Sequence, residues 1–498
     1  MSKLLVGFAE ESLVHEKRIR LAGQFYERLS EGIESEITAT AMAVTSGGEQ
    51  MIMVSGDLTS VPEYLLGLVR EKVAKENKEI DPMKITITAT HTHASHLFAN
   101  PETKAVETFA VKFLKEIGAS DKEYKPLVTM DDTILDPADA TLFVAEKIAK
   151  AVLKAWENRE EVLYTNDFGR AAVGMCRRVR YNDGSAQMWG DVNSAAFTEL
   201  EGGNDSGIEL LYFFNKNKEL KGIVANIACP SQILEHRNLI SADYWGRAKA
   251  VIREKLGANV HLIALGGAGG DQCPRDLVRW VQPENPLKDP NIKRPNVLYR
   301  KADPSMFDVE GCTRAGKRVA NEILLVLEEL GELKSDAVFC HKVINMQLPL
   351  RKATLAEYNN ALREIDYYIE KSKDKETFTF EDTAAIHVHT GTIQRFRQQQ
   401  DTEIFTVEVH VIRFGDVAFV TNPFELFLDF GNRIKARSYA HQTFIAQLTN
   451  GRGGYLPTER AEKGGHYSAY ISSGNVGHEG GDLYARLCIE EINKMFAE

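Results

Sequence analysis

The stretch KITITATHTH at residues 84–93 decides the fold more than any other part of this sequence. Its apolar and polar residues alternate, which is typical of a β-strand with one face against a core. In an extended chain every second side chain points the same way, so His91 and His93 would lie side by side at the strand end. Neutral imidazole is a good ligand for Zn²⁺, although a hydrogen-bonded pair of surface histidines has the same pattern. The stretch therefore predicts a strand with a candidate site at its end.

Strand-like and helix-like segments alternate on both sides of this stretch. Further strands are expected at residues 259–265, 403–413 and 417–421, the last two as a hairpin. Helices are expected after capping or turn residues, namely Ser60, Asp136, Ser241 and Thr354. Residues 277–303 are rich in Pro, Asn and Lys, so a long irregular loop is expected there. The pattern favours an α/β fold of the mixed α+β kind, in one catalytic unit over residues 1–498.

The composition is ordinary for a globular protein. The 498 residues include 60 Lys and Arg against 71 Asp and Glu, which gives a formal net charge of -11. A net acidic chain without basic blocks is a poor binder of nucleic acids and anionic membranes. No uninterrupted apolar run reaches the roughly 18 residues that a spanning helix needs. We therefore expect neither nucleic-acid binding nor membrane insertion.

The cysteines and the first residues bear on the cellular compartment. The six cysteines are scattered and form neither a CxxC pair nor a disulfide-like framework, which favours a reducing environment. The chain turns acidic at Glu10 and Glu11, too soon for a secretory signal peptide. A cytoplasmic protein is expected.

A glycine-rich segment, GGAGGDQCPR at residues 266–275, follows one of the predicted strands. It places Cys273 in a tight turn whose backbone N–H groups could donate to an oxyanion. The alternative is an inert cysteine in a glycine-rich connection. Because the order GxGxxG is absent and no Lys-Ser or Lys-Thr follows, a nucleotide-phosphate loop is not predicted.

Three more motifs stand at predicted strand ends. They are NIACPSQ at residues 226–232, VTNPFELF at 420–427 and TNGRGGYLPT at 449–458. Cys229 precedes a proline that cannot continue a strand, Glu425 is expected to open a helix, and Tyr455 follows a glycine loop. Each also has a structural interpretation, as a buried cysteine, a carboxylate near a helix dipole and a packed tyrosine. Their shared placement favours one site, because α/β folds gather sites at the carboxyl ends of strands.

The order of these five segments resembles the neutral/alkaline (non-lysosomal) ceramidases and their bacterial relatives. The likeness begins at LVGFA, residues 5–9, and ends near GGDLY, residues 480–484. His-Thr-His, Gly-Asp-x-x-Pro and a tyrosine in a glycine-rich Asn loop, in that order, are a specific combination. The resemblance implies a zinc amidohydrolase with a mixed α/β catalytic domain. In that family two His, one Glu and one Tyr hold the zinc, and a serine in Gly-Asp-Val-Ser-Pro is the proposed nucleophile.

Carried over position by position, the resemblance implies a zinc site at the strand ends. The implied Zn²⁺ ligands are His91, Cys229, Glu425 and Tyr455. Cys229 stands where the family has its second histidine; a thiolate is a sound zinc ligand, and His236 is a rival for the role.

The implied nucleophile position holds Cys273 where the family has serine. The thiolate could attack, could bind the metal, or could be a substitution in an enzyme in which bound water attacks. The candidate catalytic residues are Cys273, His93, Asp271 and Arg178.

Substrate binding is expected from another segment with a family counterpart. MCRRVRY, at residues 175–181, resembles an Asn-Arg-Arg stretch whose arginines could grip a carboxylate or other anion; a solvated basic strand is an equal alternative. The candidate substrate-binding residues are Arg177, Gln272 and Asp243.

The resemblance favours a zinc-dependent hydrolase that cleaves an amide (N-acyl) bond. The family's additional C-terminal β-domain has no room in this chain and no signal peptide is expected, so a small soluble substrate is favoured over a long-chain sphingolipid. Two alternatives stay open: a glycoside or ester hydrolase on a sugar-like substrate, and a non-catalytic ligand-binding protein. Sugar binding is permitted by late-loop residues, namely His466, Tyr467, Tyr470 and His478. Assembly into a homo-oligomer also stays open.

Overall fold

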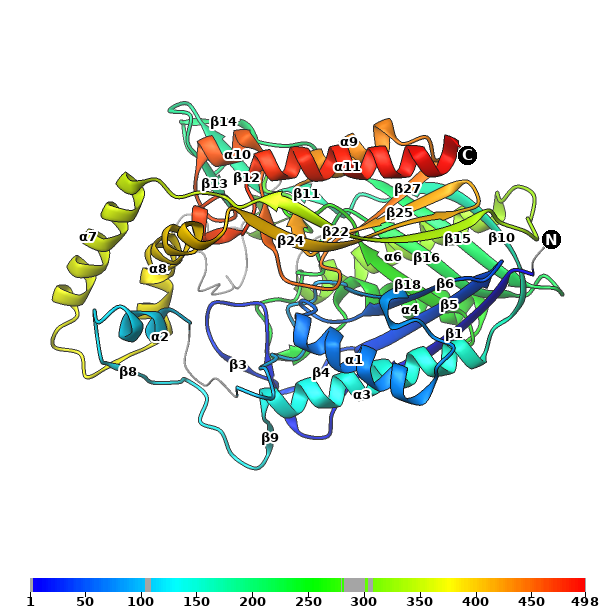
Figure 1. The fold of residues 1–498 in the computed structure, drawn as a ribbon, viewed down its shortest axis with the longest axis horizontal. Helices are drawn as coiled ribbons and strands as arrows, with labels where there is room; N and C mark the ends of the chain where they lie inside the picture. The colour runs from blue at the N-terminus through cyan, green and yellow to red at the C-terminus, as the bar shows by residue number, and fades with distance from the viewer. Residues whose placement is uncertain (1–2, 104–108, 279, 282–300, 303–307, 498) are drawn as a thin grey trace.

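The computed structural model describes residues 3–103, 109–278, 280–281, 301–302 and 308–497. Two β-sheets pack against each other, and helices cover the outer face of each (Figure 1). The fold is mixed α/β, as the alternating pattern predicts. Most of the loop expected at residues 277–303 lies outside the described residues.

The larger sheet has eight strands in the order β18-β16-β15-β10-β1-β5-β6-β7. In that order they span His261–Gly266, Leu220–Ile227, Gly207–Asn215, Glu160–Arg170, Leu5–Ser12, Thr38–Ser46, Glu49–Gly56 and Ile85–Ala89. The pairs β16–β18 and β6–β7 are parallel, and the others are antiparallel. The sheet is strongly curved: the Ser55 hydroxyl of β6 donates at 2.7 Å to the Ala264 carbonyl of β18, the strand at the far edge of the sheet. This curvature brings the ends of β7 and β18 to the same part of the molecule.

The smaller sheet has four strands in the order β22-β24-β25-β27. In that order they span Phe339–Pro349, Ile404–Phe414, Val417–Thr421 and Gln442–Ala446. β24 and β25 form the predicted hairpin. Phe414, Phe419 and Phe444 of this sheet share one buried cluster with Phe8 and Phe213 of the larger sheet. Burial of these aromatic side chains holds the two sheets together.

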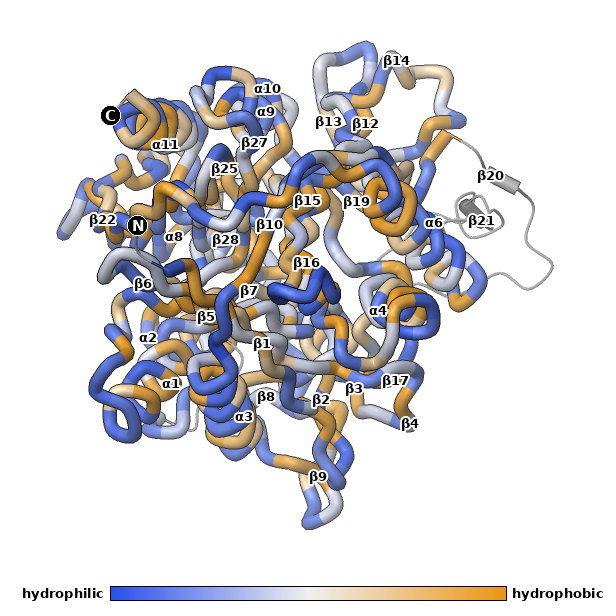
Figure 2. The backbone as a smooth tube through the Cα atoms, turned by 90° about the vertical axis from the view of Figure 1, so that its right-hand side faces the viewer, coloured by the Kyte–Doolittle hydropathy of each residue, from blue (hydrophilic) through white to orange (hydrophobic). Residues whose placement is uncertain are grey.

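Paired helices cover the outer faces (Figures 1 and 2). The pairs are α1 (Glu63–Glu76) with α3 (Pro137–Glu157), α4 (Asp243–Leu256) with α6 (Asp308–Glu328), and α9 (Leu428–Arg437) with α11 (His478–Ala497). Figure 2 shows α11 and α9 on one outer side and α1 and α3 on the other, with strands of both sheets between them. A helical arm projects to one side, built from α2 (Phe109–Glu116), α7 (Leu355–Lys371) and α8 (Phe380–Asp401).

The remaining elements are short. They are β2 (Arg18–Leu21), β3 (Arg28–Leu29), β4 (Gly32–Ile33), β8 (Glu123–Tyr124), β9 (Ile134–Leu135), β11 (Met175–Cys176), β12 (Arg178–Tyr181), β13 (Ala186–Met188), β14 (Phe197–Leu200), β17 (Leu239–Ile240), β19 (Gln272–Cys273), β20 (Trp280–Val281), β21 (Lys301–Ala302), β23 (Thr377–Phe378), β26 (Phe424–Leu426), β28 (Gly454–Leu456), α10 (Glu459–Gly464) and the 3₁₀ turns Pro82–Lys84 and Ile471–Ser473. Within the described residues, no helix has both the length and the apolar content needed to cross a bilayer.

Local capping explains several helix ends. The Asp136 side chain accepts from the Ala138 N–H at the start of α3, and the Thr354 capping box is present at α7. Helix α4 ends at Gly257, whose φ of 100° suits glycine. Ser60 does not cap α1 as expected: Pro62 is the residue at the helix start, and the Ser60 hydroxyl accepts from Arg452 Nε at 3.0 Å.

Glu425 does not open a helix as expected. It lies on the short strand β26, which pairs in parallel with β28, and α9 begins at Leu428. The pairing of β26 with β28 joins residues that are distant in sequence, which a local helix signal cannot reveal.

Candidate active site

The candidate site forms where several strands end. β7 stops just before the segment that carries His91 and His93. On β26 and β28, Glu425 is the direct partner of Tyr455. Strand pairing thus brings three separate parts of the chain to one pocket.

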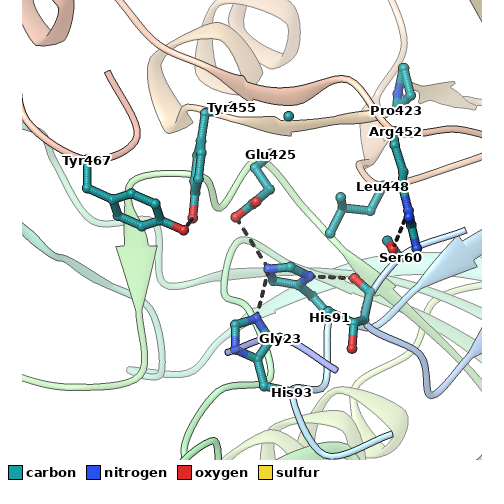
Figure 3. Close-up of a pocket in the computed structure, with 12 residues that line it drawn as sticks. Gly23, Ser60, His91, His93, Pro423, Glu425, Leu448, Arg452, Tyr455 and Tyr467 are labelled. Atoms are coloured by element: carbon teal, nitrogen blue, oxygen red, sulfur yellow. Dashed lines mark hydrogen bonds and ion pairs between the residues drawn. The ribbon is translucent and has the colours of Figure 1, made fainter. Parts of the chain in front are cut away.

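The pocket has a volume of about 250 Å³. Its walls carry one carboxylate, two imidazoles, two phenols and one guanidinium (Figure 3). The lining residues are Gly23, Thr59, Ser60, His91, His93, Pro423, Glu425, Leu448, Arg452, Gly454, Tyr455 and Tyr467. The structure therefore brings together five residues named from the sequence: His91, His93, Glu425, Tyr455 and the late-loop Tyr467.

His91 departs from the extended conformation that the alternating pattern predicts. Its φ of 63° lies in the left-handed region, which is costly for a non-glycine residue and recurs at functional sites. His91 Nδ1 donates to the Thr59 carbonyl at 2.6 Å, and His91 Nε2 lies 3.3 Å from Glu425 Oε2 (Figure 3). Because a carboxylate oxygen can only accept, this second contact is favourable when Nε2 carries a hydrogen.

His93 is held between Glu235 and Gln232. His93 Nδ1 lies 3.1 Å from Glu235 Oε2, and the Gln232 amide donates to His93 Nε2 at 2.9 Å. Burial lowers the pKa of His93, which favours the neutral imidazole. Burial works against ionisation of Glu235. The contact with His93 and the charge of Arg275 stabilise the carboxylate more strongly, so the pKa of Glu235 falls to about 2. The His93 Nε2 atom is also 3.3 Å from His91 Nε2, so the two rings form a continuous polar row with Glu425.

Two tyrosines complete the polar wall. Tyr455 and Tyr467 lie with their hydroxyl oxygens 3.2 Å apart. Burial, with the charge of Glu425, raises the pKa of Tyr455 well above 10 and that of Tyr467 to about 12. Burial also opposes ionisation of Glu425, but His91 and Arg177 overcome it and lower the pKa of that carboxyl. The wall therefore combines an ionised carboxylate with two phenolic donors.

Arg177 lies behind the pocket wall. Its side chain is 4% exposed, and its Nη2 donates to the Tyr455 hydroxyl at 3.3 Å and to the Gly270 carbonyl at 3.0 Å. Its Nη1 donates to Gln232 Oε1 at 3.1 Å. Arg177 was predicted to bind substrate, but the hydrogen bonds of its guanidinium go to protein groups.

The two cysteines of interest are buried outside the pocket lining. Burial, with the neighbouring Cys273, raises the pKa of Cys229 well above 9, and the Cys229 thiol contacts the Pro230 carbonyl at 3.5 Å. Burial raises the pKa of Cys273 to about 12, and its thiol donates to the Arg275 carbonyl at 3.2 Å. Both are neutral thiols at pH 7, and neither faces the cavity.

The remaining predicted residues have structural contacts. The Asp271 carboxylate accepts from the Leu428 N–H at the start of α9, and the Asp243 carboxylate accepts from the Leu234 N–H. Burial raises the pKa of both carboxyls to about 6. The Gln272 amide donates to the Gly203 carbonyl. These three side chains are therefore occupied by backbone groups away from the pocket lining.

Arg178, predicted as catalytic, is fully buried in a protein network. Its guanidinium pairs with both carboxylate oxygens of Glu201, at 2.6 and 3.2 Å, and donates to the carbonyls of Ala461, Gly465 and Tyr467. The network ties the late loop that carries Tyr467 to β12, so Arg178 supports the site from outside it.

The four implied zinc ligands do not assemble. In the described part of the chain, no group of three or more His, Cys, Asp or Glu side chains is arranged to hold a metal ion. His91, Glu425 and Tyr455 converge, whereas the Cys229 thiol stays outside the pocket and the Arg177 guanidinium lies beside the two oxygens. This donor set does not fit a four-coordinate zinc ion.

The rival ligand His236 does not complete the set either. Its Nε2 lies 3.4 Å from Asp308 Oδ1, at the start of α6, and it is not among the pocket-lining residues.

Several site residues carried little signal in the sequence. Tyr467 could be noted as one of several late-loop aromatics, and Gln232 and Arg452 lie inside quoted motifs without an assigned role. Gly23 and Glu235 belong to no motif, so their role follows from tertiary contacts alone.

Comparison with known proteins supports the fold. No protein-family model matches the chain, and no curated protein matches it in sequence. The structure is similar to that of a neutral ceramidase from Pseudomonas aeruginosa, with a TM-score of 0.65 and 13% identity over 99% of this chain and 75% of the other. It is also similar to a ceramidase complexed with C2, with a TM-score of 0.63 and 11% identity over 100% of this chain and 76% of the other. The chain therefore has a neutral-ceramidase-like fold.

Proposed function

We propose that this protein is a hydrolase that cleaves the amide (N-acyl) bond of a small soluble substrate. The observation that carries the proposal is the convergence of Glu425, His91 and two tyrosine hydroxyls in one pocket. The likeness to solved ceramidases supports hydrolysis as the reaction class. The pocket's volume of about 250 Å³ supports a small substrate.

The lining residues can hydrolyse an amide with water as the nucleophile. Glu425 accepts a proton from water as its oxygen attacks the carbonyl carbon. The hydroxyls of Tyr455 and Tyr467 donate to the oxyanion of the tetrahedral intermediate. The C–N bond then breaks, the proton passes from Glu425 to the leaving nitrogen, and a carboxylic acid and an amine are released. His91 orients Glu425 throughout.

Cys273 has no part in this scheme, because its thiol is buried and protonated. Zinc stays a prediction from the family resemblance, and no step is assigned to it, because the donor set does not fit. The sparse cysteines support a cytoplasmic location for the enzyme.

A substrate screen tests the reaction class. The purified chain is offered short-chain N-acyl amino compounds, aryl glycosides and aryl esters under the same conditions. We expect amine release from an N-acyl compound and no cleavage of the glycosides. Glycoside cleavage without amide cleavage would replace the amidohydrolase proposal, and binding without turnover of any compound would favour a ligand-binding protein.

A further inference from the structure

A fixed positive charge lies among the side chains that the resemblance assigns to zinc. Arg177 Nη2 is 3.3 Å from the Tyr455 hydroxyl and 3.8 Å from Glu425 Oε2. The Arg177 side chain is 4% exposed and the Glu425 side chain 16%. A guanidinium keeps its charge at every accessible pH, so this carboxylate has a permanent cationic neighbour inside the protein.

That position disfavours a dication on the same oxygens. A zinc ion binds carboxylate and phenolate oxygens at about 2 Å, which would place it next to the guanidinium. Two cations this close repel strongly in a site from which water is largely excluded. The negative charge that would attract zinc is already balanced by Arg177.

The fourth donor is missing at the same place. Cys229 stands where the family has a histidine, yet its thiol contacts the Pro230 carbonyl and is not part of the pocket lining. The loss of a donor and the presence of a cation therefore coincide in one site.

Arg177 also determines how His93 is presented. A guanidinium only donates, so Gln232 must turn its carbonyl oxygen to Arg177 Nη1 and its NH₂ group to His93 Nε2. That orientation makes His93 Nε2 an acceptor and leaves Nδ1 to face Glu235, 3.1 Å away. One arginine thus fixes three polar groups of the site: Glu425, Tyr455 and, through Gln232, His93.

We propose that Arg177 replaces the metal ion as the source of positive charge at this site, so that the protein works without bound zinc. Arg177 is a positioning residue, because it acts through Glu425, Tyr455 and Gln232. The claim that Arg177 aids catalysis rests on the proposed function. The claim that the site binds no zinc, the metal-free half of the inference, rests on the side chains alone.

Metal analysis tests the metal-free half without any substrate. The full chain is equilibrated with excess zinc chloride, dialysed, and measured for bound zinc by plasma mass spectrometry, beside a Glu425→Gln variant. We expect far less than one zinc ion per chain in both proteins. One zinc ion per chain in the wild type that is lost in Glu425→Gln would overturn the proposal. This outcome is independent of whether any amide is hydrolysed, so it is separable from failure of the proposed function.

Two substitutions test the positioning role once a substrate is known. Arg177→Lys keeps the charge, whereas Arg177→Met keeps only the side-chain bulk. We expect Arg177→Met to lower kcat on the order of 100-fold with little change in KM, and Arg177→Lys to recover much of that loss. Near-ultraviolet circular dichroism checks that both variants fold, and the wild type should keep its rate in EDTA. Equal losses in two folded variants, or inactivation by EDTA with recovery on added zinc, would contradict the proposal.

Discussion

At the scale of single residues, the site depends on close contacts that leave no room for a larger side chain. Gly23 has a φ of 98°, and a Cβ added there would lie 2.3 Å from Cγ of the His93 ring. The missing side chain therefore lets the chain pass directly over the imidazole that contacts His91. This contact makes Gly23 a sensitive test of the His93 position.

We predict that Gly23→Ala moves His93 and lowers kcat/KM at least tenfold, because His93 contacts His91, which orients Glu425, and a misplacement of about 1 Å in such a site can cost far more than that. The matched control is Gly48→Ala, since Gly48 also has a positive φ, of 86°, but has nothing within 4 Å of an added Cβ. Both variants should lose about 1 kcal/mol of stability from backbone strain, and Gly23→Ala should lose more, because its Cβ also displaces His93. Steady-state kinetics compares them, and equal activity in the two would show that the contact with His93 does not matter.

At the scale of elements, a buried polar network joins β7, β24 and the loop before β28. Asn450 has a φ of 58°; its Oδ1 accepts from the Ile87 N–H at 2.8 Å, and its Nδ2 donates to Glu408 Oε1 at 2.8 Å. Glu408 also receives two hydrogen bonds from Arg70 of α1, at 2.7 and 2.9 Å. Burial opposes ionisation of Glu408, but His410 and Arg70 lower the pKa of this carboxyl. The network therefore holds the segments that carry His91 and Tyr455 in register.

Glu408→Gln should destabilise the protein by about 3 kcal/mol, because it leaves the largely buried Arg70 without its charged partner. Glu403→Gln is the control on the residue just before the same strand; its pair with Lys352 is exposed, so little loss of stability is expected. Urea unfolding measures both values. Similar losses in the two variants would mean that the network contributes no more than a surface ion pair.

The elements also show how far the sequence can predict this structure. Helices with local caps, at Asp136 and Thr354, and the hairpin of β24 and β25 follow from neighbouring residues and were predicted. The strand at Glu425 was not, because its partner Tyr455 lies in another segment. Propensity and periodicity do not report such long-range pairing.

The site residues also fall into two groups, those whose position the sequence could predict and those whose position it could not. The sequence placed His91, His93, Glu425 and Tyr455 at strand ends. In the structure the two histidines follow β7, Glu425 and Tyr455 lie within β26 and β28, and all four line one pocket. Cys229 and Cys273 stand in equivalent motifs, but their thiols are buried outside its lining, since side-chain direction after a strand depends on tertiary packing. Their proposed roles stay predictions without support from this geometry.

At the scale of the whole molecule, buried histidines make stability depend on pH. Burial lowers the pKa of His96 to about 4, and burial together with His410 lowers the pKa of His341 to about 3. In the unfolded chain both titrate near 6.5. Between these values the unfolded state binds protons that the folded state cannot. The contribution of these two histidines to the free energy of unfolding is therefore fully present above pH 6.5 and is lost as the pH falls toward 4.

We expect each of these two histidines to remove about 2 kcal/mol of unfolding free energy between pH 8 and pH 5. His96→Gln keeps an amide donor for the Leu13 carbonyl and should remove its share of the pH dependence. His441→Gln is the control, because His441 is exposed. Urea unfolding at pH 8 and at pH 5 gives the change in unfolding free energy between the two pH values. The same change in His96→Gln as in the wild type would contradict the lowered pKa of His96.

The most direct test of the whole account is the turnover of an N-acyl substrate by Glu425→Gln. The substitution keeps the size of the side chain but removes the base, and the exposed Glu76→Gln serves as the control. The account predicts that kcat falls on the order of 100-fold or more in Glu425→Gln and stays unchanged in the control. Full activity in a folded Glu425→Gln protein would contradict it.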